Sequence, residues 1–149
     1  MEPPPGEDPP GFRTAAPSEW VQVARFAARM EIEDIGVDPR AESAKTHDAV
    51  VQERVRAGRT FVLSREGGIV FQVNVGTSHR TGAQIGGTYV PPALRGRGLA
   101  KEGVAATTRR VLVNHPRVTL HVNEANTPAV HVYVAVGYQR RDPFRLIVP

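Results

Sequence analysis

The chain has 149 residues, of which 40% are hydrophobic and 23% charged, and these values favour one globular domain. It contains no cysteine, which excludes disulfides, thiolate metal sites and a cysteine nucleophile. No apolar run approaches the roughly 20 residues of a membrane helix, and residues 1–11 lack the basic start and apolar centre of a signal peptide. We therefore expect a cytoplasmic protein without a membrane partner.

Positive charge is concentrated in the C-terminal part of the chain. The formal net charge is +4, yet residues 1–89 carry 10 basic and 12 acidic side chains, whereas residues 90–149 carry 9 basic and 3 acidic ones. A field of this sign favours an anionic ligand, which is either a phosphate-bearing cofactor or a nucleic acid.

The first third of the chain predicts a tail, a short strand and two helices. Residues 1–11 contain five prolines and three acids, which is typical of a disordered tail or linker, so the folded domain is predicted over residues 12–149. A short strand is predicted at 12–15, and Ser18 can cap the first helix. A second helix is predicted from about Ser43 to Ala57, where Gly58 ends it. The first helix turns these side chains toward a core: Trp20, Val23, Ala24, Ala27 and Met30.

The middle of the chain predicts an antiparallel meander of three strands. Residues 60–64 and 69–75 read as strands joined by a turn at Glu66-Gly67-Gly68. The third strand, residues 84–90, must end at Pro91 and Pro92, because proline has no N–H for the ladder.

The most informative segment is a glycine-rich turn, Leu94 to Ala100, which runs from this strand into a predicted helix. Backbone N–H groups at a helix N-terminus lack helical partners and carry partial positive charge, which suits phosphate oxygens. Gly96 and Gly98 let the main chain approach a diphosphate, and Arg95 and Arg97 add positive charge. The segment favours phosphate binding, although a flexible surface loop has the same composition.

Two other phosphate-binding patterns fit the sequence less well. No segment has the Gly-x-x-x-x-Gly-Lys-Ser/Thr spacing of a Walker loop. A dinucleotide fingerprint that starts at Gly96 meets Lys101 where its third glycine belongs, although Glu124 lies roughly where a ribose-binding acid would stand. One further helix and about two strands remain after the loop, which is too little for a doubly wound parallel sheet.

The pattern Gln/Arg-x-x-Gly-x-Gly/Ala matches Arg95 to Ala100 at each fixed position. Downstream, Val118–Asn123 reads as a strand, Asn126–Ala129 as a helix start, and Tyr133 with Val136–Tyr138 as a Tyr-x-x-x-Gly-Tyr ending. These motifs, in this order, resemble those of the GNAT family of N-acetyltransferases.

This resemblance covers roughly residues 12–148. Within the family, the sequence most resembles a group of actinobacterial predicted acetyltransferases that carry an additional N-terminal domain, because these have a segment like Glu33–Pro39. The family implies an α/β (α+β) fold, with a mixed, mostly antiparallel sheet of about six or seven strands and about four helices. It also implies that two copies can pair through their C-terminal strands.

The resemblance implies an enzyme that transfers an acetyl group from acetyl-CoA directly to an amine of a small molecule or peptide, within a ternary complex. Tyr133 would be the general acid that protonates the departing thiolate. Main-chain groups near Tyr89 would hold the thioester and stabilise its oxyanion. The implied acetyl-CoA-binding residues are Tyr89, Val90, Arg95, Gly96, Arg97, Gly98, Leu99, Ala100 and Asn126.

The general base is not identified by the sequence, because the strand around Gly86 lacks the glutamate that many relatives have. Glu31, Glu33 and Asp34 could attract a cationic amine, or could form a solvated helix end. No spacing of His, Asp and Glu predicts a metal site. A second hypothesis is a basic domain that binds CoA, acyl-CoA or nucleic acid without catalysis, through Arg95, Arg97, Arg109, Arg110, Arg140 and Arg141.

Overall fold

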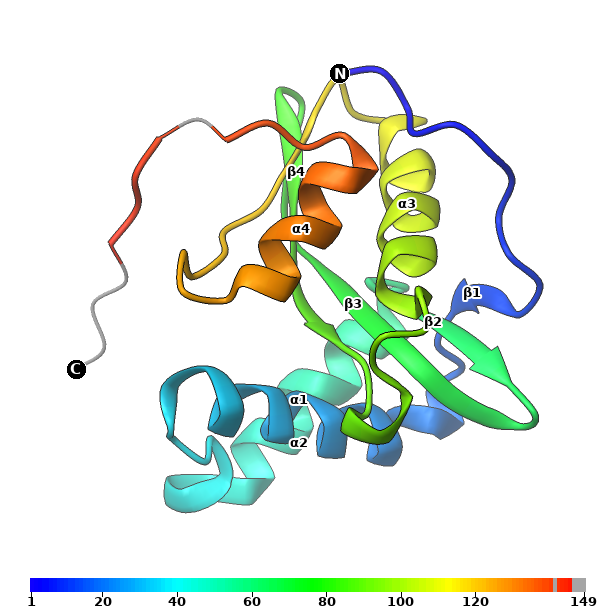
Figure 1. Ribbon diagram of the computed structural model, residues 1–149. Helices are drawn as coiled ribbons and strands as arrows, with labels where there is room; N and C mark the ends of the chain where they lie inside the picture. Colours follow the sequence, from blue (N-terminus) through cyan, green and yellow to red (C-terminus); the bar gives the residue numbers. More distant parts are fainter. Residues whose placement is uncertain (141, 146–149) are drawn as a thin grey trace.

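The computed structural model describes residues 1–140 and 142–145, and its described part is built around a five-stranded sheet (Figure 1). The strands lie side by side in sequence order, antiparallel from β1 to β4 and parallel between β4 and β5. They are β1 (Phe12–Thr14), β2 (Thr60–Arg65), β3 (Gly68–His79), β4 (Gly82–Tyr89) and β5 (Val118–Thr119). The α-helices are α1 (Trp20–Ile35), α2 (Arg40–Arg56), α3 (Leu99–Leu112) and α4 (Thr127–Val136), and 3₁₀ turns occupy Pro17–Glu19 and Pro92–Leu94.

The helices form one layer on each side of the sheet, with α1 and α2 on one face and α3 and α4 on the other (Figure 1). Successive strand residues point to opposite faces, so neighbours in β2 enter different cores. Val62 packs in the core beneath α1 and α2, whereas Leu63 packs in the core beneath α3, and both are fully buried. The predicted α/β class, the central meander and the four helices are confirmed.

The expected number of strands was too high. Six or seven strands were expected, whereas the described residues form five. The strand predicted at 118–123 is short, because only Val118 and Thr119 pair with β4. The two C-terminal strands are absent from residues 139–140 and 142–145, and their other predicted positions lie outside the described residues.

The second helix begins slightly before its predicted start and breaks once inside. Ser43 has extended backbone angles, φ −156° and ψ 102°, and its Oγ accepts a hydrogen bond from the Thr46 N–H at 3.1 Å. Serine favours this capping geometry over a helix interior, which explains why the sequence predicted a helix start there.

The N-terminal segment, residues 1–11, runs in extended form beside α3 (Figure 1). Asp8 accepts hydrogen bonds from Arg109 at 3.2 Å and from Arg110 at 2.6 Å, and Pro4 is buried.

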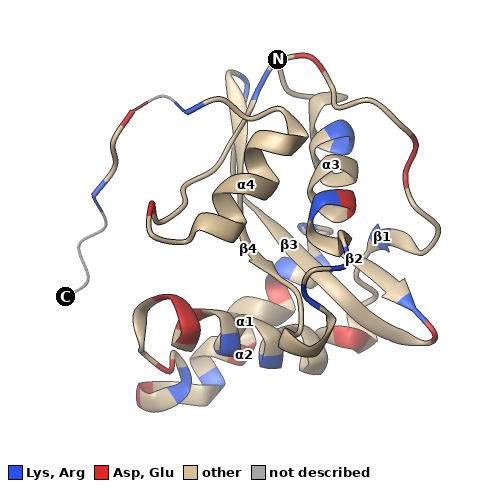
Figure 2. Ribbon diagram, viewed as in Figure 1, with Lys and Arg blue, Asp and Glu red and all other residues tan. Residues whose placement is uncertain are grey.

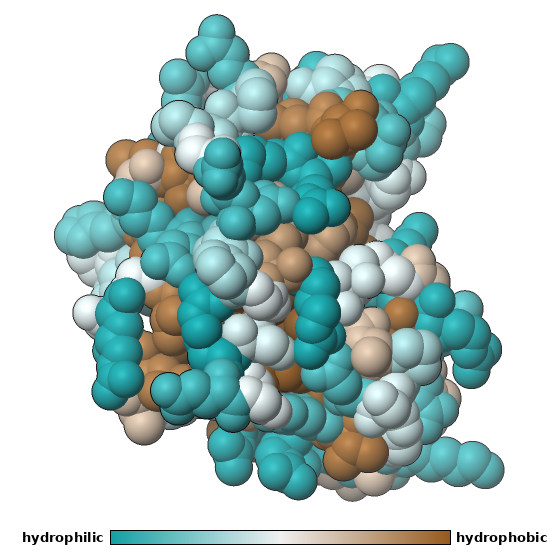
Figure 3. Space-filling view, turned by 90° about the vertical axis from the view of Figure 1, so that its right-hand side faces the viewer, coloured by the Kyte–Doolittle hydropathy of each residue, from teal (hydrophilic) through white to brown (hydrophobic). Residues whose placement is uncertain are grey.

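The face on the right of Figure 1 is mostly hydrophilic, with small separate hydrophobic areas (Figure 3). The domain start at residue 12 stays a prediction. Among the described residues, no helix has the length and apolarity that a bilayer crossing requires.

Candidate active site

The predicted phosphate-binding turn connects the end of β4 to the first turn of α3. Gly96 and Gly98 have φ of 79° and 82°, a left-handed conformation that glycine adopts without strain. Gly98 is the N-cap of α3, and the first helical bond runs from the Glu102 N–H to the Gly98 carbonyl at 3.0 Å. The N–H groups of residues 96–101 donate to no residue that the structure describes. This row of unpaired N–H groups at a helix N-terminus has the chemistry of an anion site.

The two arginines of the turn lie in different surroundings. Arg95 Nε donates to the Val90 carbonyl at 2.9 Å, and its Nη2 pairs with Glu33 at 2.7 Å. Its guanidinium also lies over the Tyr89 ring, 5.5 Å from the centroid. Arg97 is exposed and forms no ion pair with the described residues. The side chain of Arg95 thus links the turn to α1, although it is also partly exposed, whereas Arg97 is exposed without such a link.

The edge of β4 that faces β5 is open over most of its length. The two strands pair only at Ala83 with Val118 and at Gln84 with Thr119, after which they diverge. On the other edge, the register with β3 shifts between Tyr89 and Gly86, so that two residues of β4 oppose one of β3. Such a bulge leaves main-chain groups without a ladder partner. The expected separation of these strands is confirmed.

The side chains of Tyr89 and Val90 are buried, with 3% and 7% of their surfaces exposed. Tyr89 packs against Phe26 of α1, at a ring-centroid distance of 5.1 Å. The side chains of these two residues are therefore closed to a ligand, and contacts of their main-chain groups with acetyl-CoA stay a prediction.

Tyr133 is a largely buried residue of α4 that faces the bulge of β4. Burial raises the pKa of its hydroxyl, the side chain of Thr88 opposes this shift, and the carboxylate of Asp34 adds to it. Tyr133 thus lies within electrostatic reach of both β4 and the last turn of α1. A tyrosine hydroxyl keeps its proton at neutral pH, as a general acid must, and its raised pKa makes it a weaker proton donor.

Gly137 ends α4 with a φ of 116° and returns the chain toward α3. The Tyr138 hydroxyl then lies 2.8 Å from the Thr108 Oγ1, and the Tyr138 ring meets that of Tyr133 edge to face at 6.1 Å. This contact holds the end of α4 against α3.

Asn126 caps α4, because its Oδ1 accepts a hydrogen bond from the Ala129 N–H at 3.3 Å. Its side chain therefore has a structural role, and its contact with a cofactor stays a prediction. The remaining predicted residues, Leu99 and Ala100, form the first turn of α3 and are partly buried.

Asp34 is an acidic residue whose charge adds to the rise that burial causes in the pKa of the Tyr133 hydroxyl. Burial also raises the pKa of Asp34 itself, Glu33 adds to that shift, and Arg95 opposes it. Glu33 is paired with Arg95, whereas Asp34 forms no ion pair with any described residue. The sequence named both carboxylates but could not separate them, because the separation depends on an arginine 62 positions away from Glu33.

Most of the arginines that supported a nucleic-acid interface are engaged within the chain. Glu33 pairs with Arg95, Asp8 with Arg109 and Arg110, and Glu124 with Arg140. Arg141 lies outside the described residues. Figure 2 shows that Lys and Arg positions are interspersed with Asp and Glu positions along the ribbon. Within the described ranges, no group of three or more His, Asp or Glu side chains is arranged to hold a metal ion.

Comparison with solved structures identifies the fold. A predicted acetyltransferase from Clostridium acetobutylicum, solved with acetyl-CoA, superposes with a TM-score of 0.71 and 16% identity over 92% of this chain and 94% of that one. A GNAT acetyltransferase from Bacillus anthracis gives 0.70 and 19% over 93% and 84%. A ribosomal-protein-alanine N-acetyltransferase from Brucella melitensis gives 0.70 and 15% over 85% and 82%.

No curated protein matches the sequence. The family model described as FR47-like protein matches residues 72–146, which include β4, the glycine-rich turn, α3 and Tyr133. The superpositions cover between 85% and 93% of the chain. This protein therefore belongs to the FR47-like family and has the fold of the GNAT acetyltransferases.

Proposed function

We propose that this protein is an N-acetyltransferase, which transfers the acetyl group of acetyl-CoA directly to an amine within a ternary complex. The observation that carries the proposal is the row of unpaired N–H groups at residues 96–101, next to the open edge of β4 and Tyr133. The presence of acetyl-CoA in the Clostridium acetobutylicum structure supports the same ligand here.

The glycine-rich turn would hold the pyrophosphate of acetyl-CoA. Its N–H groups need acceptors, and the N-terminus of α3 adds partial positive charge. Arg97 lies on the solvent side of the same turn and would add a charged contact. The unpaired main-chain groups of β4 would hold the pantetheine arm, and a single N–H on the thioester oxygen typically contributes about 3 kcal/mol to catalysis.

Acetyl-CoA supplies an activated acetyl group, and the protein must place an amine against it. The amine nitrogen forms a bond to the carbonyl carbon as the carbon–sulfur bond breaks. The departing thiolate takes a proton from the Tyr133 hydroxyl, and the attacking nitrogen loses one. Asp34 would receive that proton directly or through water, because its charge reaches Tyr133 and its raised pKa makes it a better base.

Calorimetry and a thiol-release assay test this function in turn. Acetyl-CoA should bind with micromolar affinity, and Arg97→Glu should weaken binding by like-charge repulsion. Tyr133→Phe should leave the affinity for acetyl-CoA unchanged and lower kcat by about 100-fold or more, as expected for loss of a general acid.

Tyr138→Phe is the matched control, because it removes an equally enclosed hydroxyl from the neighbouring ring. It should leave kcat close to that of the wild type. Folded protein that binds no acetyl-CoA would refute the proposal. Equal kcat values for the two variants would remove Tyr133 from the mechanism.

A further inference from the structure

A pair of side chains with acid–base chemistry lies at the opposite end of α3 from the glycine-rich turn. The Ser78 Oγ is 2.7 Å from the His115 Nε2. Ser78 lies near the end of β3, and His115 follows the C-terminus of α3. A helix of this length measures about 20 Å, so the pair is well separated from the proposed acetyl-CoA site. Neither residue takes part in the proposed acetyl transfer.

A β-bulge at Gly76 turns Ser78 toward His115. Before the bulge, Val75 pairs with Ile85, which packs in the core beneath α3. Regular alternation from Val75 would place Ser78 on the opposite side of the sheet. The extra residue shifts the register, so that Ser78 pairs with Ala83, another member of the core beneath α3. Bulges redirect side chains in this way, and they are frequent beside active sites.

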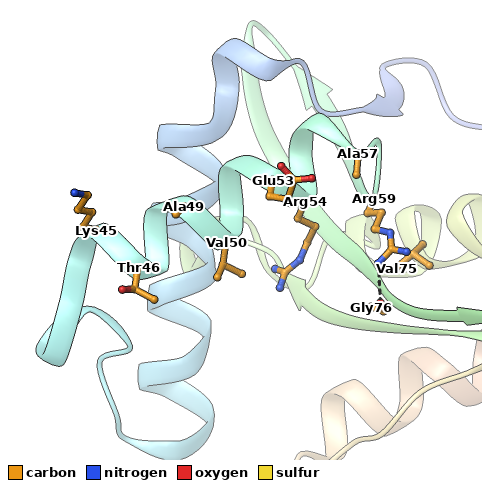
Figure 4. A pocket seen from close by; sticks show the side chains of 10 residues that line it. All are labelled: Lys45, Thr46, Ala49, Val50, Glu53, Arg54, Ala57, Arg59, Val75 and Gly76. Atoms are coloured by element: carbon orange, nitrogen blue, oxygen red, sulfur yellow. Dashed lines mark hydrogen bonds between the residues drawn. The ribbon is translucent and has the colours of Figure 1, made fainter.

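A side chain from outside the ladder holds the bulge in place. The guanidinium of Arg59, which precedes β2, donates to the Gly76 carbonyl at 3.2 Å (Figure 4). This contact lies at one end of an open groove between α2 and β3 (Figure 4). A bulge leaves main-chain groups without a ladder partner, and the arginine supplies one. The direction of Ser78 is therefore set by a bonded feature of the strand.

The second nitrogen of the His115 ring determines where its proton lies. The Nδ1 is 3.1 Å from the carbonyl oxygen of Val111, which can only accept a hydrogen bond. In the neutral ring, Nδ1 therefore carries the proton and donates to this carbonyl. Nε2 is then an acceptor, so the Ser78 hydroxyl donates to it. The Ser78 hydroxyl is thus bonded to a base whose tautomer is fixed by the end of α3.

These three groups have the arrangement that activates a serine. A serine hydroxyl is a weak nucleophile until a base within hydrogen-bond reach takes its proton, and a third group must orient that base. Here His115 is the base, and the Val111 carbonyl is the orienting group. Ser78 is exposed and His115 is half-buried, so a substrate can reach the oxygen while the ring stays held.

We propose that Ser78 and His115 form a second reactive site, at which Ser78 takes the acyl group of a small activated carboxylic ester. The Ser78 Oγ forms a bond to the ester carbonyl carbon as the His115 Nε2 accepts the hydroxyl proton. The bond from that carbon to the leaving oxygen then breaks, and the leaving oxygen takes the proton from His115. The products are acyl-Ser78 and an alcohol or phenol. Because Ser78 is exposed, little binding energy is available, and the ester must supply a good leaving group.

Labelling with p-nitrophenyl acetate tests this site. The reagent should acetylate Ser78 of the wild type with release of p-nitrophenol, and peptide mass spectrometry should find the acetyl group on that residue. His115→Gln should lower the rate of this labelling about 100-fold, as expected for loss of a general base. His79→Gln is the matched control and should keep the wild-type rate. The His79 Nδ1 lies 3.3 Å from the Thr81 Oγ1, but no described residue orients that ring from its other nitrogen.

Alkylation of a thiol at the same position gives a second measurement that does not depend on the ester. The chain contains no cysteine, so Ser78→Cys introduces a single thiol. Iodoacetamide should alkylate Ser78→Cys about 10-fold faster than Ser78→Cys/His115→Gln, because the adjacent base increases the fraction of thiolate.

Acetylation of Ser78 that requires His115 would support the site, as would the faster alkylation. Equal labelling of Ser78 in the wild type and in His115→Gln would overturn the inference, and so would acetyl groups on other residues but not on Ser78. Equal alkylation rates for the two thiol variants would also overturn it. The pair would then be only a structural contact between β3 and the end of α3.

Discussion

Replacement of Gly98 by alanine tests whether this glycine is needed for ligand binding or only for the conformation of the turn. Gly98 has a φ of 82°, and a Cβ built on it would meet no atom within 4 Å. The substitution therefore adds backbone strain without a steric clash, and the strain of a left-handed alanine is about 1 kcal/mol. Gly67 in the turn between β2 and β3 is a matched control, because its φ is 79° and its Cβ would also meet no atom within 4 Å.

We expect the two variants to lose the same stability, about 1 kcal/mol each, or about 3 °C in Tm. Only Gly98→Ala should weaken CoA binding, because the methyl group stands among N–H groups that would contact the pyrophosphate. The loss of one charge-assisted hydrogen bond corresponds to about a 10- to 100-fold higher Kd. Chemical denaturation of the ligand-free proteins gives the first quantity, and calorimetry with CoA gives the second.

The comparison has two refuting outcomes. If both variants bind CoA like the wild type, the glycine-rich turn is a structural connection and its N–H groups do not hold the pyrophosphate. If Gly67→Ala weakens binding as much as Gly98→Ala, the effect arises from general destabilisation.

Three further predictions concern the packing and titration of the site. Gly103→Ala should destabilise the protein by up to about 2 kcal/mol in urea denaturation, because the new Cβ would lie 2.3–2.6 Å from three ring atoms of the fully buried Phe71. This overpacking outweighs the gain of about 1 kcal/mol in helix propensity, so a more stable variant would contradict the packing described. Burial raises the pKa of Tyr138 to about 12, so the neutral hydroxyl contributes up to about 3 kcal/mol to the free energy of unfolding below pH 10, and this contribution is lost as pH rises from 10 through 12. In Tyr138→Phe, the free energy of unfolding should therefore fall less steeply with pH in that window. Asp34→Asn should lower kcat and remove the fall of kcat/KM at acidic pH, since the wild-type carboxyl has a pKa raised by burial and loses its base form as pH falls through that pKa. An unchanged pH profile would exclude Asp34 as the base.

The parts of the fold that follow local pattern were predictable from the sequence. Alternating strand residues, the turn at Gly67 and the prolines after β4 each act within a few residues, so the meander and the glycine-rich turn were predicted in their correct places. The C-terminal strands failed as predictions within the described residues because the family pattern, rather than any alternation in the chain itself, suggested them.

Contacts between distant segments could not be predicted in the same way. Arg95 was expected to face a phosphate, yet the structure pairs it with Glu33, and no local pattern links these two residues. The acidic character of residues 1–11 suggested a solvated tail, whereas Asp8 finds two arginines of α3 about 100 positions later.

The last turn of α1 contributes to several of the contacts around the candidate site. Its three carboxylates, Glu31, Glu33 and Asp34, lie at the C-terminal end of the helix, where the helix dipole already places negative charge, so their arrangement is unfavourable for the helix alone. Each one, however, interacts with a different group. Glu33 pairs with Arg95, which fixes the glycine-rich turn. Burial lowers the pKa of Arg54, and the charge of Glu31 opposes that shift. Burial raises the pKa of the Tyr133 hydroxyl, and the charge of Asp34 adds to that shift. A local destabilisation of this kind persists where the charges serve a purpose other than folding, and under the proposed function we expect that purpose to be the attraction of a protonated amine.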